Sequence, residues 1–218
     1  MIKNASLENK NVLITGGAGF IGSELTKQVL SHGAKVSVVD NLVNGKKSNL
    51  NLDDKNLMFY EEDIRNQQVM QNLISKSDYV FNLACLGVRH SIHSPIESHS
   101  VNADATLNLL KMSKETDIKK FVHISTSEVY GTAKYVPMTE EHPTAPHTVY
   151  GASKLAGEAY ARAYSKSLNT NTVVIRPFNS YGYNSHHEGD SGEVIPKFII
   201  RALTGNPLYI FGDGEQTR

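Results

Sequence analysis

The chain has 218 residues, of which 39% are hydrophobic, so it is long enough to bury the core of one domain or slightly more. Lys plus Arg and Asp plus Glu each number 22, and this zero net charge gives no global attraction to nucleic acid or an anionic membrane. We expect a cytoplasmic protein, because residues 1–17 contain no apolar signal core and no apolar run is long enough to span a bilayer. The single cysteine, Cys85, excludes an internal disulfide framework.

Short β-branched runs alternate with helical patterns along the first three quarters of the chain. Strands are predicted at 11–15, 35–40, 57–63, 78–84, 119–125 and 170–178, and helices at 20–33, 66–76, 101–115 and from Tyr150 onward. Continuously apolar strands separated by helices indicate a parallel sheet covered on both faces. The predicted fold is therefore α/β, a doubly wound parallel sheet of the Rossmann type.

The composition changes after Arg176 and Pro177, where residues 178–193 form a loop rich in Gly, Asn and His. A short helical pattern at 194–203 and a strand-like segment at 207–214 follow it. We assign residues 1–176 to a Rossmann domain and 177–218 to the beginning of a smaller substrate domain. Because the chain stops directly after a turn, we expect this second domain to be truncated.

A glycine triplet, Gly16, Gly19 and Gly22, lies between the first predicted strand and the first predicted helix. Asp40 ends the next strand, at the spacing of a dinucleotide fingerprint. Glycine allows the backbone to approach a pyrophosphate, which then meets the N–H groups and positive end of the helix. This combination predicts a nucleotide site rather than only a tight connection.

The charge of Asp40 favours NAD over NADP, because it accepts hydrogen bonds from a ribose and repels a 2′-phosphate. Lys46 and Lys47, on the following loop, weaken that preference. Asp63 follows the third strand, where it either contacts the adenine edge or caps the next helix, and the sequence favours neither.

Tyr150 and Lys154 are four residues apart on a predicted helix, so they share one face. Tyr130 and Lys134 have the same spacing, but a loop with Gly131 follows Tyr130, and we expect this tyrosine only to pack. A tyrosine has a reference pKa of about 10 and needs nearby positive charge to act as a base. Lys154 and an oxidised nicotinamide would supply that charge.

Eight short motifs occur in one order along the chain: "TGGAGFIG", "DNL", "DI", "NLA", "STSEVYG", "YGASK", "RPFNSYG" and "FGDGEQTR". With them the chain resembles the extended short-chain dehydrogenase/reductases of the nucleotide-sugar epimerase/dehydratase family. The resemblance implies tightly held NAD and a 4-keto sugar intermediate. It places the cofactor against these residues: Gly16, Gly19, Phe20, Ile21, Gly22, Asp40, Asn41, Asp63, Ile64, Leu83, Ala84, Tyr150 and Lys154.

The resemblance also implies the roles of the catalytic residues. Tyr150 would be the base on the sugar hydroxyl, Lys154 would tune it and hold the nicotinamide ribose, and Thr126 would hydrogen-bond the same sugar oxygen. Asn179 and Arg218 match positions that contact the nucleotide diphosphate, which suits the fork geometry of arginine. The substrate implied is a UDP- or dTDP-hexose, and members of this family are often homodimers.

Ser127 and Glu128 follow Thr126, and they determine which reaction the resemblance favours. In 4,6-dehydratases the corresponding pair is Asp then Glu, and the glutamate removes the C5 proton, whereas 4-epimerases need no second base. Glu128 therefore slightly favours a dehydratase, although the acid is replaced by Ser127. A decarboxylase would instead need a cation for the C6 carboxylate, which Arg89 offers. Glu128 as a plain structural acceptor is a further alternative.

Some features are set aside. His90, His93 and His99 have a spacing that would suit zinc, with His186 and His187 nearby, but no cysteine or carboxylate cluster accompanies them, and we expect no metal. The loop 82–95 is expected to line the sugar and nicotinamide pocket, with Cys85 simply packing there. Two other functions stay open: an NAD-binding module without turnover, and a simple alcohol dehydrogenase that releases NADH.

Overall fold

The computed structural model describes residues 6–189, 192–210 and 212–215. Its centre is a six-stranded parallel sheet in the order β3-β2-β1-β4-β5-β6. The strands are β1 (Asn11–Thr15), β2 (Lys35–Val39), β3 (Leu57–Tyr60), β4 (Tyr79–Asn82), β5 (Lys120–Ile124) and β6 (Thr172–Ile175). The predicted doubly wound Rossmann sheet is confirmed.

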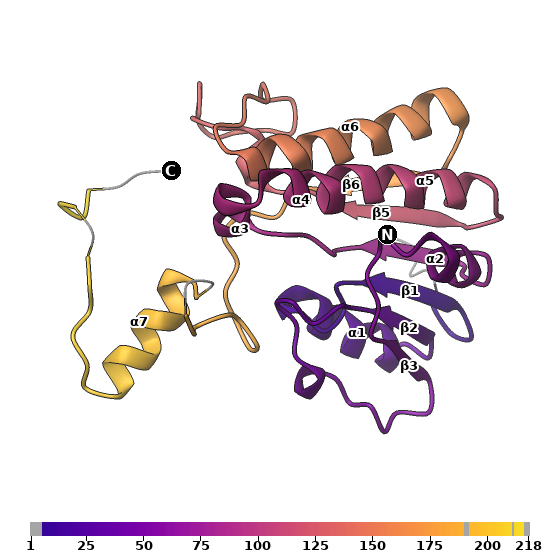
Figure 1. Cartoon of the computed structure of the whole chain (residues 1–218), viewed down its shortest axis with the longest axis horizontal. Coiled ribbons are helices and arrows are strands. Elements are labelled where there is room, and N and C mark those ends of the chain that lie inside the picture. The colour runs from indigo at the N-terminus through magenta and orange to yellow at the C-terminus, as the bar shows by residue number, and fades with distance from the viewer. Residues whose placement is uncertain (1–5, 190–191, 211, 216–218) are drawn as a thin grey trace.

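The strand order reverses at β1, which pairs with β2 on one side and with β4 on the other (Figure 1). In register, Thr15 at the end of β1 lies opposite Val39 of β2 and Asn82 of β4. The carboxyl ends of the central strands therefore meet at one edge, where the loops diverge to opposite faces. Sheets of this kind bind ligands in that crevice.

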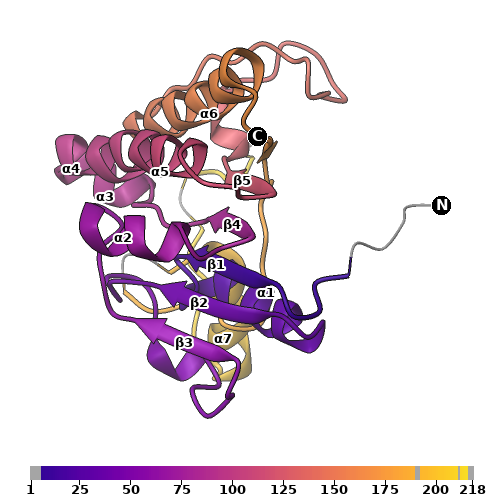
Figure 2. The same ribbon diagram turned by 90° about the vertical axis from the view of Figure 1, so that its right-hand side faces the viewer.

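Helices cover both faces of the sheet (Figure 2). One buried cluster packs beneath α2 (Gln67–Ile74), α5 (Thr106–Lys114) and α6 (Val149–Leu168), with Leu13 and Phe121 at its centre. A second cluster packs beneath α1 (Phe20–Ser31) on the other face. In β1 the residues from Val12 to Thr15 are all buried, and in β2 only Lys35 is exposed, because helices cover both faces of the sheet there.

Two segments differ from the sequence-based expectation. The expected loop 82–95 contains the short helix α3 (Val88–His93), and α4 (Pro95–His99) begins where that loop was expected to end. A π-helical turn, η2 (Ser100–Ala105), joins α4 to α5. Residues 207–210 and 212–214, expected to be strand-like, form no strand. An extended segment becomes a strand only when another strand supplies hydrogen bonds, and within the described residues none lies beside it.

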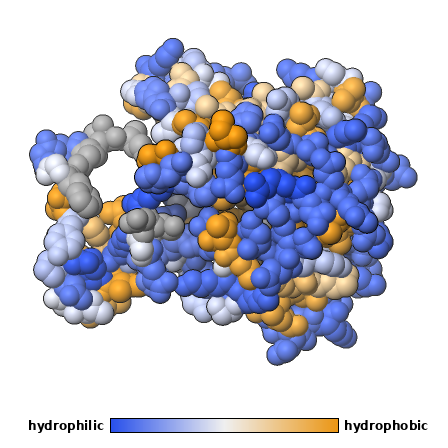
Figure 3. All heavy atoms as spheres, in the orientation of Figure 1, coloured by the Kyte–Doolittle hydropathy of each residue, from blue (hydrophilic) through white to orange (hydrophobic). Residues whose placement is uncertain are grey.

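The last described helix, α7 (Val194–Leu203), lies apart from the helices that cover the sheet (Figure 1). It exposes Val194, Ile199 and Leu203, and the exposed Leu208 and Tyr209 follow it. Orange apolar side chains are visible at this end of the molecule in the space-filling view (Figure 3). Within the described residues, no helix is long and apolar enough to cross a membrane.

Candidate active site

A large pocket opens at the carboxyl edge of the sheet, where the strand order reverses. Its volume is about 670 Å³, which lies within the range of cofactor and small-molecule sites. Eighteen residues of the expected site line it: Gly16, Gly19, Phe20, Ile21, Gly22, Asp40, Asn41, Asp63, Ile64, Leu83, Ala84, Arg89, Thr126, Ser127, Glu128, Tyr150, Lys154 and Asn179. The remaining one, Arg218, lies outside the described residues.

The glycine turn forms one wall of the pocket, and its packing requires glycine. Gly16 has φ +68°, and a methyl group there would meet the backbone nitrogen of Ala84 at 2.8 Å. A methyl group on Gly22 would lie 2.1 Å from the carbonyl oxygen of Gly16. Gly19 precedes α1, and within the described chain no side chain caps this helix. The N–H groups of its first turn therefore face the pocket without an intrahelical acceptor.

Asp40, directly after β2, ties the glycine turn to the loop that follows β2. One carboxylate oxygen accepts a hydrogen bond from the N–H of Ala18 (2.9 Å), and the other accepts from the N–H of Leu42 (2.9 Å). Lys46, expected to weaken the preference for NAD, forms an ion pair with Glu188 (2.9 Å). The neighbouring Lys47 pairs with Glu61 at 2.6 Å. The positive charge of each lysine is therefore paired with a carboxylate of the protein itself.

Asp63 belongs to a polar cluster on the far side of the pocket. Its carboxylate accepts hydrogen bonds from the guanidinium of Arg65 and from the side-chain amide of Asn41 (3.0 Å). The hydrogen bonds from Arg65 hold the pKa of Asp63 below its ordinary value, against the effect of partial burial. Asn66, whose side chain accepts from the N–H of Val69, caps α2 instead. The helix-cap alternative for Asp63 is therefore wrong.

Tyr150 and Lys154 reach the pocket from the first turns of α6. The helix begins with a side-chain cap, in which Thr148 accepts from the N–H of Gly151 at 2.9 Å. Thr126, which follows β5, lines the same pocket as Tyr150. Burial raises the pKa of Tyr150 well above the ordinary tyrosine value. The polar side chain of Thr126 lowers the pKa of Tyr150 and so opposes that rise only in part.

Lys154 is held beneath Tyr150, with 2% of its surface exposed. Its ammonium group donates to the carbonyl oxygen of Ile124 at 2.5 Å. Burial lowers the pKa of Lys154, and the buried carboxylate of Glu158, one turn further along α6, raises it in part. His123, buried on β5 beside this lysine, has a pKa well below the ordinary value, because of burial first and the lysine charge second.

The segment after β5 lines the part of the pocket that also contains Tyr150 and Lys154. Its lining residues are Thr126, Ser127 and Glu128. Thr126 begins the 3₁₀ turn η3 (Ser127–Val129), and its hydroxyl accepts from the N–H of Glu128 at 3.2 Å. The N–H of Ser127 donates to the carbonyl oxygen of Pro177 at 3.0 Å. Glu128 is half-buried in the pocket wall. Tyr130 is almost fully buried against Phe178 and Arg176, as expected of a packing residue.

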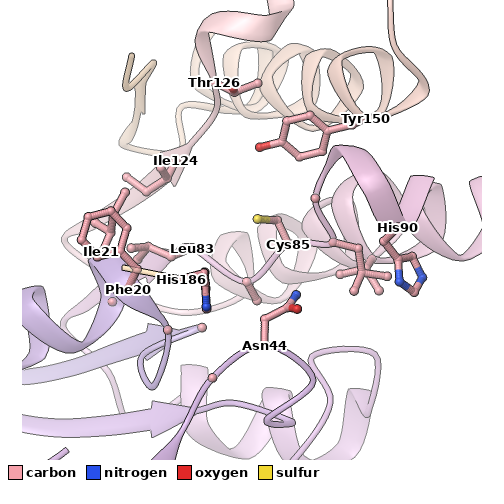
Figure 4. A pocket seen from close by; sticks show the side chains of 18 of the residues that line it. Phe20, Ile21, Asn44, Leu83, Cys85, His90, Ile124, Thr126, Tyr150 and His186 are labelled. Carbon is pink, nitrogen blue, oxygen red and sulfur yellow. The ribbon is translucent and has the colours of Figure 1, made fainter. Parts of the chain in front are cut away.

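Two further residues line the pocket, and sequence reasoning gave neither of them a role there. Cys85 belongs to the loop that was expected to line the pocket, and its sulfur lies near the hydroxyl of Tyr150 (Figure 4). His186, from the loop between β6 and α7, lines it as well. This loop is tied back to α1, because the side-chain amide of Asn184 donates to the hydroxyl of Ser23 at 3.1 Å. No local pattern around Cys85 or His186 indicates contacts this distant in sequence.

The comparisons with known proteins agree with this geometry. The model of the NAD dependent epimerase/dehydratase family matches residues 12–218. The chain belongs to this family. The predicted family and its cofactor, NAD, are thereby confirmed.

Several members of the epimerase/dehydratase family are similar to the chain. The solved UDP-N-acetylglucosamine 4-epimerase of Methanobrevibacter ruminantium has a TM-score of 0.91 and 36% identity, with 96% of this chain and 67% of that chain covered. The dTDP-glucose 4,6-dehydratase of Streptomyces venezuelae, solved with NAD bound, has a TM-score of 0.86 and 33% identity, with 94% and 65% covered. UDP-glucuronic acid decarboxylase 1 of Xenopus tropicalis is 34% identical over 218 residues. This covers 97% of the chain but only 50% of the decarboxylase.

The residues present fit NAD. The close approach of Gly16, Gly19 and Gly22 to the neighbouring backbone leaves the N-terminus of α1 open to a pyrophosphate. Asp40 lies at the ribose position of the fingerprint, directly after β2. Among the described residues, no group of three or more His, Cys, Asp or Glu side chains is placed to hold a metal ion.

Proposed function

We propose that the protein is a nucleotide-sugar enzyme that works through a 4-keto intermediate, with a 4,6-dehydratase favoured over a 4-epimerase. The observation that carries this choice is that Glu128 and Tyr150 line the same pocket from different elements, together with Thr126. A base for the C4 hydroxyl and a second carboxylate thus face one cavity. The substrate class we propose is a UDP- or dTDP-linked hexose.

NAD, held by the turn of Gly16, Gly19 and Gly22, would supply reversible hydride chemistry, with the hydride taken from C4 of the sugar returned at C6. Tyr150 takes the proton of the C4 hydroxyl, and Thr126 positions the same oxygen. A ketone at C4 makes the C5 proton acidic, and Glu128 removes it. Since Ser127 cannot act as an acid near neutral pH, Glu128 itself gives a proton to the departing C6 hydroxyl. The net loss is one water, and solvent supplies the new proton at C5.

The main alternative is a 4-epimerase, which needs Tyr150 and Thr126 but leaves Glu128 without a chemical role. The similarity to the Methanobrevibacter 4-epimerase supports it. A decarboxylase is supported by Arg89, an exposed cation on the pocket rim at the start of α3. A decarboxylase would act on a sugar that carries a C6 carboxylate. The three reactions therefore differ in their products.

The test is incubation of the purified protein with UDP- and dTDP-hexoses and UDP-hexuronic acids in deuterated water, with NAD added. A product that has lost water and carries deuterium at C5 supports the dehydratase. An isomer of unchanged mass without label supports the epimerase, and loss of carbon dioxide supports the decarboxylase. Net release of NADH identifies a simple dehydrogenase. NAD binding without any product would identify a binding module.

Two variants sharpen the result. Glu128→Gln keeps the size of the side chain but removes the base, so it should abolish water loss while leaving NAD binding unchanged. Glu115→Gln, an exposed change after α5, serves as the matched control. Full water loss by Glu128→Gln would exclude the proposed role of this carboxylate.

A further inference from the structure

Residues 182–188, on the loop between β6 and α7, lie against the cofactor half of the molecule, and we call them the strap. At its start, Gly182 lies beside the ring of Phe20, the first residue of α1. Near its end, His186 lines the large pocket together with Gly16 of the glycine turn, and its imidazole is visible there in Figure 4. The wall of the cofactor pocket therefore includes a segment that follows the last strand of the sheet.

The first tie between the strap and the glycine turn is a hydrogen bond. The side-chain amide of Asn184 donates to the hydroxyl of Ser23 at 3.1 Å. Ser23 is buried in α1 and directly follows Gly22, the last glycine of the turn. Asn184 has φ +66°, a left-handed conformation that asparagine adopts more readily than most residues. The backbone conformation of the strap therefore contributes to the direction of this amide.

The second tie is the ion pair of Lys46 with Glu188, at 2.9 Å. The N–H of Lys46 donates to the carbonyl oxygen of Ala18, inside the glycine turn, at 3.1 Å. Both side chains of the ion pair are more than half exposed, so the pair by itself is weak. The strap is thus tied to the turn at two points, one in α1 and one through the loop that follows β2.

The other end of the strap is joined to α7. The carbonyl oxygen of His186 accepts from the N–H of Glu193 at 2.9 Å. The ammonium group of Lys197 donates to the carbonyl oxygen of Gly189, the residue after the strap, at 2.7 Å. The strap and the first turn of α7 are therefore connected to each other, and the two ties connect both to the glycine turn.

We propose that the strap is a gate for the cofactor: it closes over the glycine turn, and NAD enters or leaves when the ties of Asn184 to Ser23 and of Lys46 to Glu188 break. The ties use only groups of the protein, so they form whether or not NAD is bound. A gate of this kind slows entry and release by the same factor, and the equilibrium affinity does not change. The inference concerns cofactor exchange and goes beyond the proposed reaction, since it requires no turnover.

The test measures NADH binding and release by stopped-flow fluorescence in the purified protein, with release followed after addition of excess NAD. Glu188→Gln removes the charge of one tie, and Asn184→Gly removes the amide of the other while still allowing φ +66°. We expect each variant to raise the association and dissociation rate constants about threefold, because each tie is a single weak interaction. The dissociation constant should stay unchanged. Glu115→Gln, an exposed change after α5, should alter neither rate.

A charge swap separates the gate from a direct effect of charge on the anionic cofactor. Glu188→Lys places two cations together, so the tie should break and release should become faster, whereas attraction of the pyrophosphate to the new cation would by itself slow release. Adding Lys46→Glu restores an opposite pair, and the release rate should return toward that of the unmodified protein. Melting temperatures check that each variant is folded.

Two results would overturn the proposal. One is that the association and dissociation rates of every variant equal those of the unmodified protein. The other is faster release with an unchanged association rate, which would mean that the strap only contacts the bound cofactor. A failure to turn over any sugar would instead count against the proposed function, because NADH exchange is measured without substrate.

Discussion

The ammonium group of Lys154 donates a hydrogen bond to the backbone carbonyl of Ile124, the last residue of β5, at 2.5 Å. This contact ties the first turns of α6 to the end of a central strand. It fixes the position of Lys154 relative to β5. Because Tyr150 lies one turn earlier on the same helix, its position relative to the sheet is fixed as well. The Tyr and Lys pair is thus placed by the sheet as well as by helical spacing.

Replacing Lys154 by methionine should remove both the positive charge near Tyr150 and its anchor on β5. We expect turnover to fall about 10²- to 10⁴-fold, the usual contribution of acid–base catalysis. NAD affinity, measured by calorimetry, should fall as well. Lys166→Met, an exposed change on the same helix, is the matched control. Unchanged turnover in Lys154→Met would contradict the role proposed for this residue.

The variant Gly22→Ala tests the glycine turn. Its methyl group would lie 2.1 Å from the carbonyl oxygen of Gly16, so the backbone must shift away from the geometry that admits a pyrophosphate. We expect NAD affinity to fall at least about tenfold, which corresponds to about 1.4 kcal/mol. Gly182→Ala, whose methyl group meets Phe20 at an ordinary 3.6 Å, should bind NAD normally. Equal affinities for the two variants would argue against a nucleotide at this turn.

The variant Asp40→Asn tests the preference for NAD over NADP. The amide oxygen can keep one hydrogen bond to the N–H of Ala18 or Leu42, but the negative charge is lost. NAD affinity should fall, while the ratio of NADP to NAD affinity should rise, because a 2′-phosphate no longer meets a carboxylate. Competitive titration with both dinucleotides measures this ratio. The exposed change Asp53→Asn should leave it unaltered.

Glu158 and Arg176 form a buried ion pair beneath the site, and Glu158 is 1% exposed. Removing one partner leaves a buried charge without compensation, so Glu158→Gln should reduce the free energy of unfolding by about 3 kcal/mol or more. Burial alone would raise the pKa of Glu158, but the hydrogen bond from Arg176 and nearby charges hold it below the ordinary value. The pair therefore stabilises the fold above about pH 4.5, and this stability is lost as pH falls through the folded pKa. Urea unfolding between pH 5 and about pH 3 should show a weaker acid dependence for Glu158→Gln than for the unmodified protein.

His123 should act in a different pH range. Its folded pKa is depressed by burial and by Lys154, so the unfolded chain binds the proton first as pH falls below about 6.5. Stability should therefore decrease from that pH downward. His123→Asn cannot take up this proton, and its melting temperature should depend less on pH between 7 and 5. The control variant His99→Asn changes an exposed histidine near Asp104. Its melting temperature should depend on pH as that of the unmodified protein does. Equal slopes for the unmodified protein and His123→Asn would contradict this account.

The sequence alone was sufficient for the sheet, the family and most of the pocket lining. Gly16, Gly22 and Asp40 carry information locally, because a phosphate turn needs glycine at fixed spacing and the ribose position follows at the end of the next strand. The pairing of Tyr150 with Lys154 can also be predicted from local sequence, since helical spacing alone puts the two residues on one face. The parallel sheet follows from the continuous apolar character of its strands.

Only the tertiary structure decided how residues far apart in sequence meet. Cys85, on the loop after β4, and Tyr150, in the first turn of α6, line one pocket, and the ion pair of Lys46 with Glu188 spans 142 positions. The segment 207–214 has strand-like composition, yet its described residues form no strand, because pairing depends on what lies beside it. Local sequence sets conformation through sterics and periodicity. The choice of partners depends instead on where the folded backbone brings each side chain, and no short pattern records this.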